Sequence, residues 1–187
     1  TTVITLISFL PPSYFRKDEL GIDYNFTHIE EIDKIHVPKF NSMTTEYWPH
    51  HDGYSNEIKT NGDNLSVKIL YGGFVFSEGN WVKEIIQDPE HYYTGEEFAL
   101  TIRSFTHGYD IFTPSKLLAW HRCHYNPLKK HYTNNNEVGD AKHRHAMERL
   151  RKLIEGEELG IYGLGNARTV EDYGNFAGID FKNKVLK

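Results

Sequence analysis

The sequence predicts an α/β fold built around one core. Short apolar runs rich in β-branched residues, typical of buried strands, alternate along the chain with segments whose apolar residues recur at helical spacing. The chain has 187 residues, of which 39% are hydrophobic, so it can bury one sizeable core but is too short for two large domains. One domain, or part of one, is therefore the expected unit.

The first strand is predicted at residues 3–10, where an apolar run leads into two prolines. This run is too short to span a bilayer and has no basic flank or cleavage pattern ahead of it. A buried strand needs neighbours on both sides, so a chain that begins in one indicates missing upstream sequence. Residues 13–68 are mostly polar and are expected to be ordered loop, apart from strands near residues 35–37 and 65–70.

The central part of the chain predicts a strand, a helix and two further strands. Paired glycines open the strand at residues 72–76, where the backbone must pass close to something. The helix follows from Gly95, and Gly108 lies where a left-handed cap would end it. Short apolar strands are predicted next, at residues 110–112 and 117–120.

The last part of the chain is expected to be mainly helical. After a polar asparagine loop, Asp140 is expected to cap a helix whose apolar residues keep helical spacing over 146–154. The tail over residues 163–181 is mixed and aromatic-rich, with another helix start near Thr169.

Charge and cysteine content narrow the class of protein. The formal net charge is -5 at pH 7, from 26 acidic and 21 basic residues. This balance gives no overall attraction to nucleic acid or to an anionic membrane. The single cysteine, Cys123, cannot form an internal disulfide, so a reducing, cytoplasmic compartment fits best. We therefore expect no nucleic-acid partner and no membrane partner.

The densest functional signal is an ordered series of short motifs. They are Gly72-Gly73-Phe74-Val75-Phe76-Ser77, Gly95-Glu96-Glu97, Arg103, Thr106-His107-Gly108-Tyr109-Asp110 and Trp120-His121. In this order the chain resembles the C-terminal half of the cytosolic hydroxyproline polypeptide N-acetylglucosaminyltransferases. It is more distantly similar to the polypeptide N-acetylgalactosaminyltransferases, which have a Gly-Gly strand, a Gly-Glu-Asn helix start and a Gly-His strand end. Both ends of the chain also match the first family, so the resemblance covers nearly all of it.

The resemblance implies a metal-dependent α/β glycosyltransferase of the GT-A type. Residues 1–187 would form the acceptor-side, C-terminal half of one catalytic domain, with a helical extension over residues 130–187. The Asp-x-Asp motif of the family is missing, because the nearest acidic pair with that spacing, Glu31-Ile32-Asp33, follows the first strand instead of preceding it. We expect the chain to be a fragment, a part completed by another polypeptide, or a degenerate relative, and to be inactive alone.

The implied reaction transfers a sugar from a UDP-sugar to a polypeptide hydroxyl, and N-acetylglucosamine is the first candidate for that sugar. The resemblance also implies retention of configuration and a requirement for Mn²⁺ or Mg²⁺. The resemblance assigns His121 as a metal ligand, and His124 is the second candidate. A neutral imidazole at a strand end is a common ligand of a divalent cation, which would offset the charge of the departing diphosphate. Without the resemblance, a lone histidine is more often a hydrogen-bonded core residue.

Two acidic residues and two glycines are the main site candidates. By the family motif Glu96 contacts the sugar and Glu97 is a second catalytic candidate. Adjacent helix residues do not face the same way, so at most one is expected to point into the site. Both can also be ordinary first-turn acids that stabilise a helix. Gly72 and Gly73 would let the backbone approach the donor sugar, although a β-bulge explains paired glycines nearly as well.

Four further residues are candidates for donor or acceptor binding: Phe74, Arg103, His107 and Trp120. Arg103 could orient a carboxylate through a forked contact, although a structural ion pair is the simpler role. Trp120 could stack on a sugar or a peptide, and burial is its alternative.

Two other classes of protein compete with this interpretation. The 11 histidines suggest a metal hydrolase or metal-binding module, but none of them forms the His-Glu-x-x-His arrangement. A carbohydrate- or partner-binding domain could keep the fold and lack the chemistry. The expected partners are a UDP-sugar, a polypeptide acceptor, and either a second copy of the chain or the missing N-terminal half.

Overall fold

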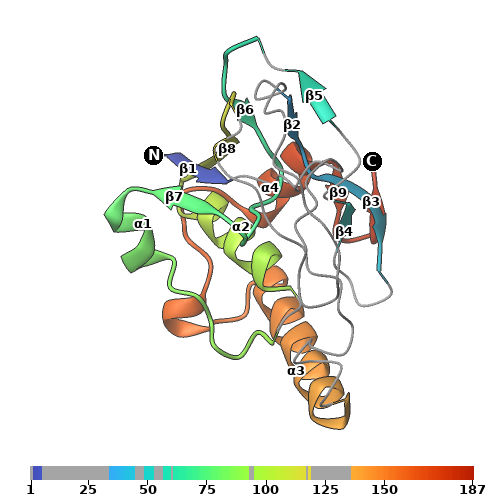
Figure 1. Cartoon of the computed structure of the whole chain (residues 1–187). Coiled ribbons are helices and arrows are strands. Elements are labelled where there is room, and N and C mark those ends of the chain that lie inside the picture. The colour runs from blue at the N-terminus through green and yellow to red at the C-terminus, as the bar shows by residue number, and fades with distance from the viewer. Residues whose placement is uncertain are drawn as a thin grey trace, which may run out of the picture.

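The computed structural model describes residues 2–5, 34–44, 49–52, 57–59, 61–92, 95–116, 118 and 136–187. In these residues helices pack around a mixed sheet, and three two-stranded sheets lie beside it (Figure 1). This mixture of helices and small sheets is compatible with the predicted α/β class. None of the helices in the described part of the chain is long and apolar enough to cross a membrane.

The mixed sheet has four strands in the order β6-β8-β1-β7. Their bounds are β1 (Thr2–Thr5), β6 (Leu65–Ser66), β7 (Val75–Ser77) and β8 (Asp110–Thr113). β1 runs parallel to β8 and antiparallel to β7, with Thr5 opposite Val75. The carboxyl ends of β1 and β8 and the start of β7 therefore lie at one edge of the sheet, which we call the carboxyl edge.

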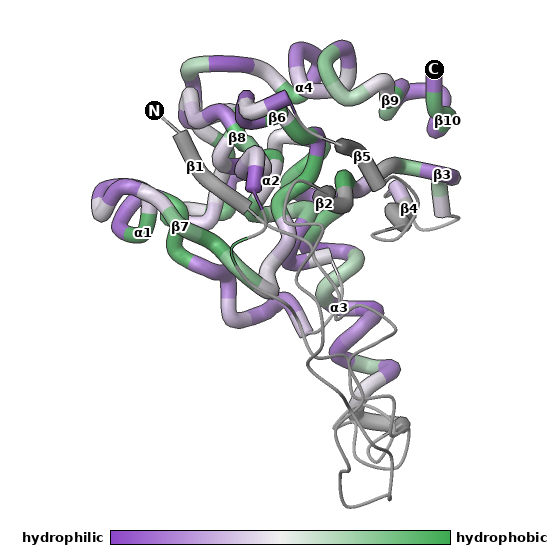
Figure 2. The backbone as a smooth tube through the Cα atoms, turned by 45° about the horizontal axis from the view of Figure 1, so that its top comes forward, coloured by the Kyte–Doolittle hydropathy of each residue, from purple (hydrophilic) through white to green (hydrophobic). Residues whose placement is uncertain are grey.

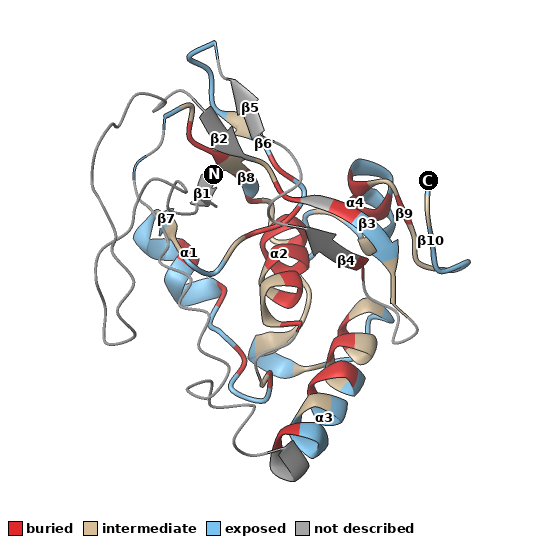
Figure 3. Ribbon diagram, turned by 45° about the vertical axis from the view of Figure 1, so that its right-hand side comes forward, coloured by how far each residue is buried: buried red, intermediate tan, exposed pale blue. Residues whose placement is uncertain are grey.

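The helix α2 (Glu96–Thr106) precedes β8 and lies against the sheet. Its apolar side is buried, and it is mostly red in the centre of Figure 3. The predicted left-handed cap is confirmed, because Gly108 has a φ of 92°. Since α2 leads directly into β8 and packs on it, the helix begins near the carboxyl edge and ends near the opposite, amino edge.

The helix α3 (Asn136–Ile154) begins earlier than predicted. Asp140 is exposed inside the helix, so the prediction that it caps the first turn is wrong. A solvated aspartate costs a helix interior only about 0.7 kcal/mol, and the extra turn continues the intrahelical hydrogen bonds. Hydrophilic and hydrophobic residues alternate along the described part of α3 in Figure 2, as expected of a helix with one buried face.

The helix α4 (Val170–Ala177) confirms the helix start predicted near Thr169. The Thr169 hydroxyl accepts a hydrogen bond from the Asp172 amide at 3.0 Å, and the Asp172 carboxylate accepts one from the Thr169 amide at 2.8 Å. This reciprocal pair satisfies two amides that the helix itself cannot. The helix ends at Gly178, which has a φ of 76°.

Several short elements differ from the predictions. The strand predicted near residues 35–37 is confirmed as β2 (Lys34–His36). The rest of 13–68 was expected to be mostly loop, but the structure pairs β2 with β5 (Glu57–Lys59) and β3 (Lys39–Met43) with β4 (Pro49–Asp52). The strand predicted at 65–70 is only the two residues of β6. Also unforeseen are α1 (Gly79–Glu84), the 3-10 helix η2 (Gly160–Tyr162), β9 (Ile179–Asp180) and β10 (Val185–Leu186). The unpredicted strands are short and pair through their main chains, and the pattern of hydrophobic residues along the sequence does not reveal such pairing. The strand predicted at 117–120 and the end of the one at 3–10 lie outside the described residues.

Two hydrophobic clusters hold these elements together. The larger joins α2, α3 and α4, and Phe98 on α2 lies 5.8 Å from Tyr173 and 6.2 Å from Phe40, ring centre to ring centre. The smaller gathers Trp81 of α1 and Ile111 of β8 with neighbours from the segment after β6. α2 therefore contributes to the core on more than one side, which fixes both of its ends.

Candidate functional site

The glycine pair meets Glu97 of the acidic pair at the carboxyl edge. The Gly72 amide donates a hydrogen bond to Oε1 of Glu97 at 2.7 Å. Gly72 and Gly73 are exposed, whereas Glu96 and Glu97 are half-buried. We call Gly72, Gly73, Glu96 and Glu97 the edge site. It places open backbone beside the Glu97 carboxylate, and ligands of open α/β sheets bind outside the carboxyl ends of the strands.

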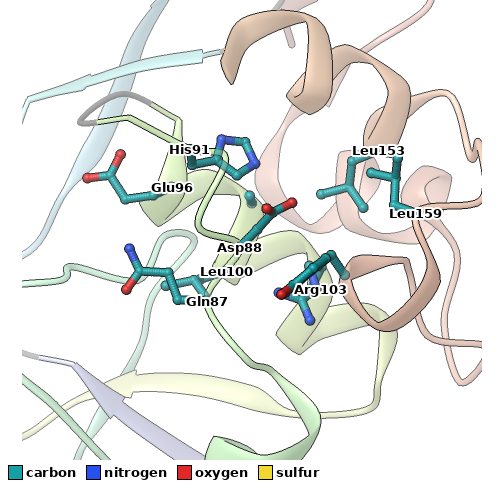
Figure 4. Close-up of a pocket in the computed structure, with 10 residues that line it drawn as sticks. Gln87, Asp88, His91, Glu96, Leu100, Arg103, Leu153 and Leu159 are labelled. Carbon is teal, nitrogen blue, oxygen red and sulfur yellow. The ribbon is translucent and has the colours of Figure 1, made fainter. Parts of the chain in front are cut away.

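The two acidic side chains have different surroundings. Glu97 contacts the Gly72–Gly73 turn, whereas Glu96 lines a cavity of about 10 Å³ together with Asp88, His91 and Arg103. Figure 4 shows the Glu96 carboxylate turned away from Asp88. A cavity of this size has room for about one water molecule. The two side chains therefore have different neighbours, as expected of adjacent residues on a helix, and Glu97 is the one that bonds to the glycine turn.

Gly95 is required by the geometry at the start of α2. Its φ is 80°, a conformation that only glycine adopts without strain. A Cβ at this position would lie 2.8 Å from Cε of Met147 and 3.2 Å from Cδ2 of Leu150, both on α3. The glycine of the Gly-Glu-Glu motif therefore lets α3 pack directly beneath the helix start that carries both acids.

Arg103 is buried, with only 1% of its surface exposed. Its guanidinium donates hydrogen bonds to three backbone carbonyl oxygens, those of Ile86 at 2.6 Å, Ile161 at 3.0 Å and Gly163 at 3.3 Å. Burial lowers the pKa of Arg103, and nearby Asp88 opposes this effect. The contacts give Arg103 a structural role in joining three segments, and contact with a ligand stays a prediction.

The Thr-His-Gly-Tyr-Asp motif lies at the other end of α2. The Thr106 carbonyl accepts hydrogen bonds from the Ala167 amide at 2.9 Å and the Arg168 amide at 3.2 Å, and the Thr106 hydroxyl accepts one from the Gly165 amide at 3.0 Å. A Cβ on Gly165 would lie 2.5 Å from the Thr106 carbonyl oxygen. The motif is thus closely packed against the segment 163–168.

His107 belongs to this distant end of the helix. Nδ1 of His107 donates a hydrogen bond to the Arg103 carbonyl at 2.8 Å, because a carbonyl oxygen can only accept. With a rise of 1.5 Å per residue, His107 lies about 16 Å along α2 from Glu96. The structure brings Gly72, Gly73 and Glu97 together but does not bring His107 to them.

The remaining predicted residues divide between the described and undescribed parts of the chain. Phe74 is half-buried and joins the glycine turn to β7. Trp120, His121 and His124 lie outside the described residues. Among the residues that the structure describes, no group of three or more His, Cys, Asp or Glu side chains is placed to hold a metal ion.

Thr101 is a site residue that the sequence analysis missed. It is fully buried, and its hydroxyl accepts a hydrogen bond from the Leu70 amide at 2.8 Å. The signal available in the sequence was a polar residue one helical turn after Glu97, on the buried side of an otherwise apolar segment.

Comparison with known families gives one match. A family model described as Glycosyltransferase (GlcNAc) matches residues 3–183. No curated protein and no solved structure matches the chain. The matched range contains the edge site, all of α2 and the packed segment 163–168.

Proposed function

Because the chain belongs to the Glycosyltransferase (GlcNAc) family, and is thus an enzyme of the transferase type that moves a sugar, we propose its donor, acceptor and site. The donor is UDP-N-acetylglucosamine and the acceptor is a hydroxyl group of a polypeptide. The observation that carries this proposal is the edge site, where exposed glycine backbone lies beside a half-buried carboxylate at the carboxyl ends of β1 and β8.

The residues of the edge site have complementary parts in this proposal. Gly72 and Gly73 have no side chains, so a sugar ring can approach their backbone closely. Glu96 supplies carboxylate oxygens that accept hydrogen bonds from the sugar hydroxyls. Such contacts orient the donor for attack by the acceptor hydroxyl, and positioning of this kind lowers the barrier of a transfer reaction.

The proposal extends to a GT-A catalytic domain that works in the cytoplasm with retention and with Mn²⁺ or Mg²⁺. A divalent cation would offset the charge of the departing diphosphate. The described side chains do not supply a ligand set for a metal ion, so no step is assigned to one. His121 is its proposed ligand, and it lies outside the described residues.

The direct test is a transfer assay with the native protein, labelled UDP-N-acetylglucosamine and peptides containing hydroxyproline, serine or threonine. We expect Glu96→Ala to lower kcat/KM about 100-fold, the effect typical of losing one positioned polar contact. Glu171→Ala is the matched control, since Glu171 is an exposed acid in the first turn of α4. A native protein that binds the donor but transfers no sugar would contradict the proposal and favour a binding domain that keeps the fold.

A further inference from the structure

Two hydrogen bonds attach the segment before β7 to one face of α2. The Leu70 amide donates to the Thr101 hydroxyl at 2.8 Å, and the Gly72 amide donates to Oε1 of Glu97 at 2.7 Å. Glu97 and Thr101 are four residues apart, so they lie one above the other on the helix. Two successive turns of α2 thus hold two amides of the same segment.

The first of these attachments is rigid. Thr101 has no exposed surface, and its hydroxyl donates to the Glu97 carbonyl at 2.6 Å while it accepts from Leu70. Leu70 is itself fully buried in the smaller hydrophobic cluster. The segment therefore leaves the core at a fixed point, immediately before it reaches the exposed glycines.

The second attachment brings the Glu97 side chain close to position 72. A Cβ on Gly72 would lie 3.2 Å from Oε1 and 3.6 Å from Cγ of Glu97. A Cβ on Gly73 would lie 2.5 Å from Cε1 of Tyr71. Close approach thus accounts for both glycines, and at Gly72 the approaching group is the carboxylate itself.

We infer that Glu97 is a positioning residue that fixes the Gly72–Gly73 turn against the start of α2. Its Oε1 is occupied by the Gly72 amide, so the group presented to the donor is the backbone of the turn, while Glu96 supplies the carboxylate that contacts the sugar. The contact with the donor rests on the proposed function, whereas the attachment of the turn does not.

Amide exchange measured by NMR on the native protein tests the attachment without any substrate. Glu97→Ala removes the acceptor, and we expect exchange of the Gly72 amide to become at least about tenfold faster, as for loss of a hydrogen bond to a charged group. Glu97→Gln keeps a side-chain oxygen at the same reach and should retain most of the protection. Glu171→Ala removes an acid from the same helical position of α4 and should leave Gly72 unchanged.

Transfer kinetics test the consequence for the reaction. A positioning role predicts that Glu97→Gln keeps kcat/KM within about threefold, with an unaltered pH profile, because the acceptor is retained. Glu97→Ala should raise KM for the UDP-sugar more than it lowers kcat. The inference is overturned if Gly72 exchange is unchanged in Glu97→Ala, or if Glu97→Gln is as inactive as Glu97→Ala while the turn stays protected. A native protein without transfer activity would end the proposed function, and the exchange experiment would still decide the role of Glu97.

Discussion

The two ends of α2 carry equally dense sequence motifs but differ in how their polar groups are used. At its start, exposed Gly72 and Gly73 lie beside Glu97, and Glu96 lines a cavity with room for about one water molecule. At its end, Thr106 receives three hydrogen bonds from the segment 163–168, and Gly165 packs directly on the Thr106 backbone.

The difference distinguishes two reasons why a sequence motif can occur, namely packing within the protein and contact with a ligand. The motif at the end of the helix is explained by packing, because its polar atoms find partners within the protein. At the start, Gly95 and Glu97 also have packing or hydrogen-bonding reasons, but Gly72 and Gly73 lie exposed at the surface, and this is the end that we propose binds the donor. We call the end of α2 at Thr106 the closed end and its start at Glu96 and Glu97 the open end. Substitutions at the closed end should therefore cost stability, and those at the open end should mainly affect donor binding.

The largest expected effect is at Arg103, which joins the closed end to two other segments. Arg103→Met removes three hydrogen bonds made by a buried charged group, and we expect it to lower the free energy of unfolding by about 4 kcal/mol. Urea unfolding measures this change. Arg144→Met is the control, because Arg144 is exposed on α3, and its change should stay within about 0.5 kcal/mol. Similar values for both variants would remove the structural role assigned to Arg103.

Gly165 tests the packing of the closed end itself. In Gly165→Ala the new Cβ would meet the Thr106 carbonyl oxygen and the His107 backbone nitrogen at 2.5 and 2.6 Å, and backbone cannot move aside as a side chain can. We expect a loss of about 3 kcal/mol in urea unfolding. Gly79→Ala is the matched control, because nothing lies within 4 Å of its added Cβ. A normal stability for Gly165→Ala would show that the segment 163–168 is not held as described.

Tyr109 makes the closed end sensitive to alkaline pH. Its hydroxyl donates to Oε2 of Glu84 at 2.6 Å, and burial, followed by this hydrogen bond, raises the pKa of Tyr109 to about 12. A raised pKa in the folded state means that folding favours the protonated phenol. This contribution to stability is complete below the unfolded pKa of about 10 and is lost as the pH rises through about 12.

The measurement is the urea midpoint from pH 9 to 12 for the wild type and Tyr109→Phe. At pH 9 the variant should be less stable by about 1.5 kcal/mol, since it lacks the bond to a charged group. The difference between the two proteins should shrink toward pH 12. A constant difference across this range would contradict the assigned ionisation.

The smallest effect on stability is expected at the open end. In Gly72→Ala the Cβ would lie 3.2 Å from Oε1 of Glu97, the far end of a side chain that can move. We expect the free energy of unfolding to change by less than about 1 kcal/mol, whereas the affinity for the UDP-sugar should fall because the turn is displaced. A loss as large as that of Gly165→Ala would mean that both ends of α2 are equally structural.

Local signals in the sequence predicted the parts of the fold that depend on local chemistry. Gly108 ends α2 and Thr169 starts α4 because a left-handed residue and a capping hydroxyl act within a few residues of themselves. Asp140 has the same capping chemistry, and its prediction failed because α3 extends one turn further toward the N-terminus. Which of several competent caps a helix uses is decided by its packing as well as by its sequence.

Contacts between distant residues could not be predicted in this way. The candidates Gly72, Gly73, Glu96 and Glu97 came from motifs, but the bond from Gly72 to Glu97 joins residues 25 apart in the sequence. The bond from Arg103 to Gly163 spans 60 residues. Such pairings depend on how the sheet and helices are placed, which no pattern within one segment reports.

Donor binding to the two ends of α2 tests the central claim most directly. Native protein is titrated with UDP-N-acetylglucosamine in the presence of Mg²⁺, and the amide signals of Gly72, Gly73 and Gly108 are followed by NMR. An edge site that binds the donor predicts that the signals of Gly72 and Gly73 shift with the titration while that of Gly108 stays in place. Shifts at Gly108 with unchanged signals at Gly72 and Gly73 would contradict the account and move the site to the other end of the helix.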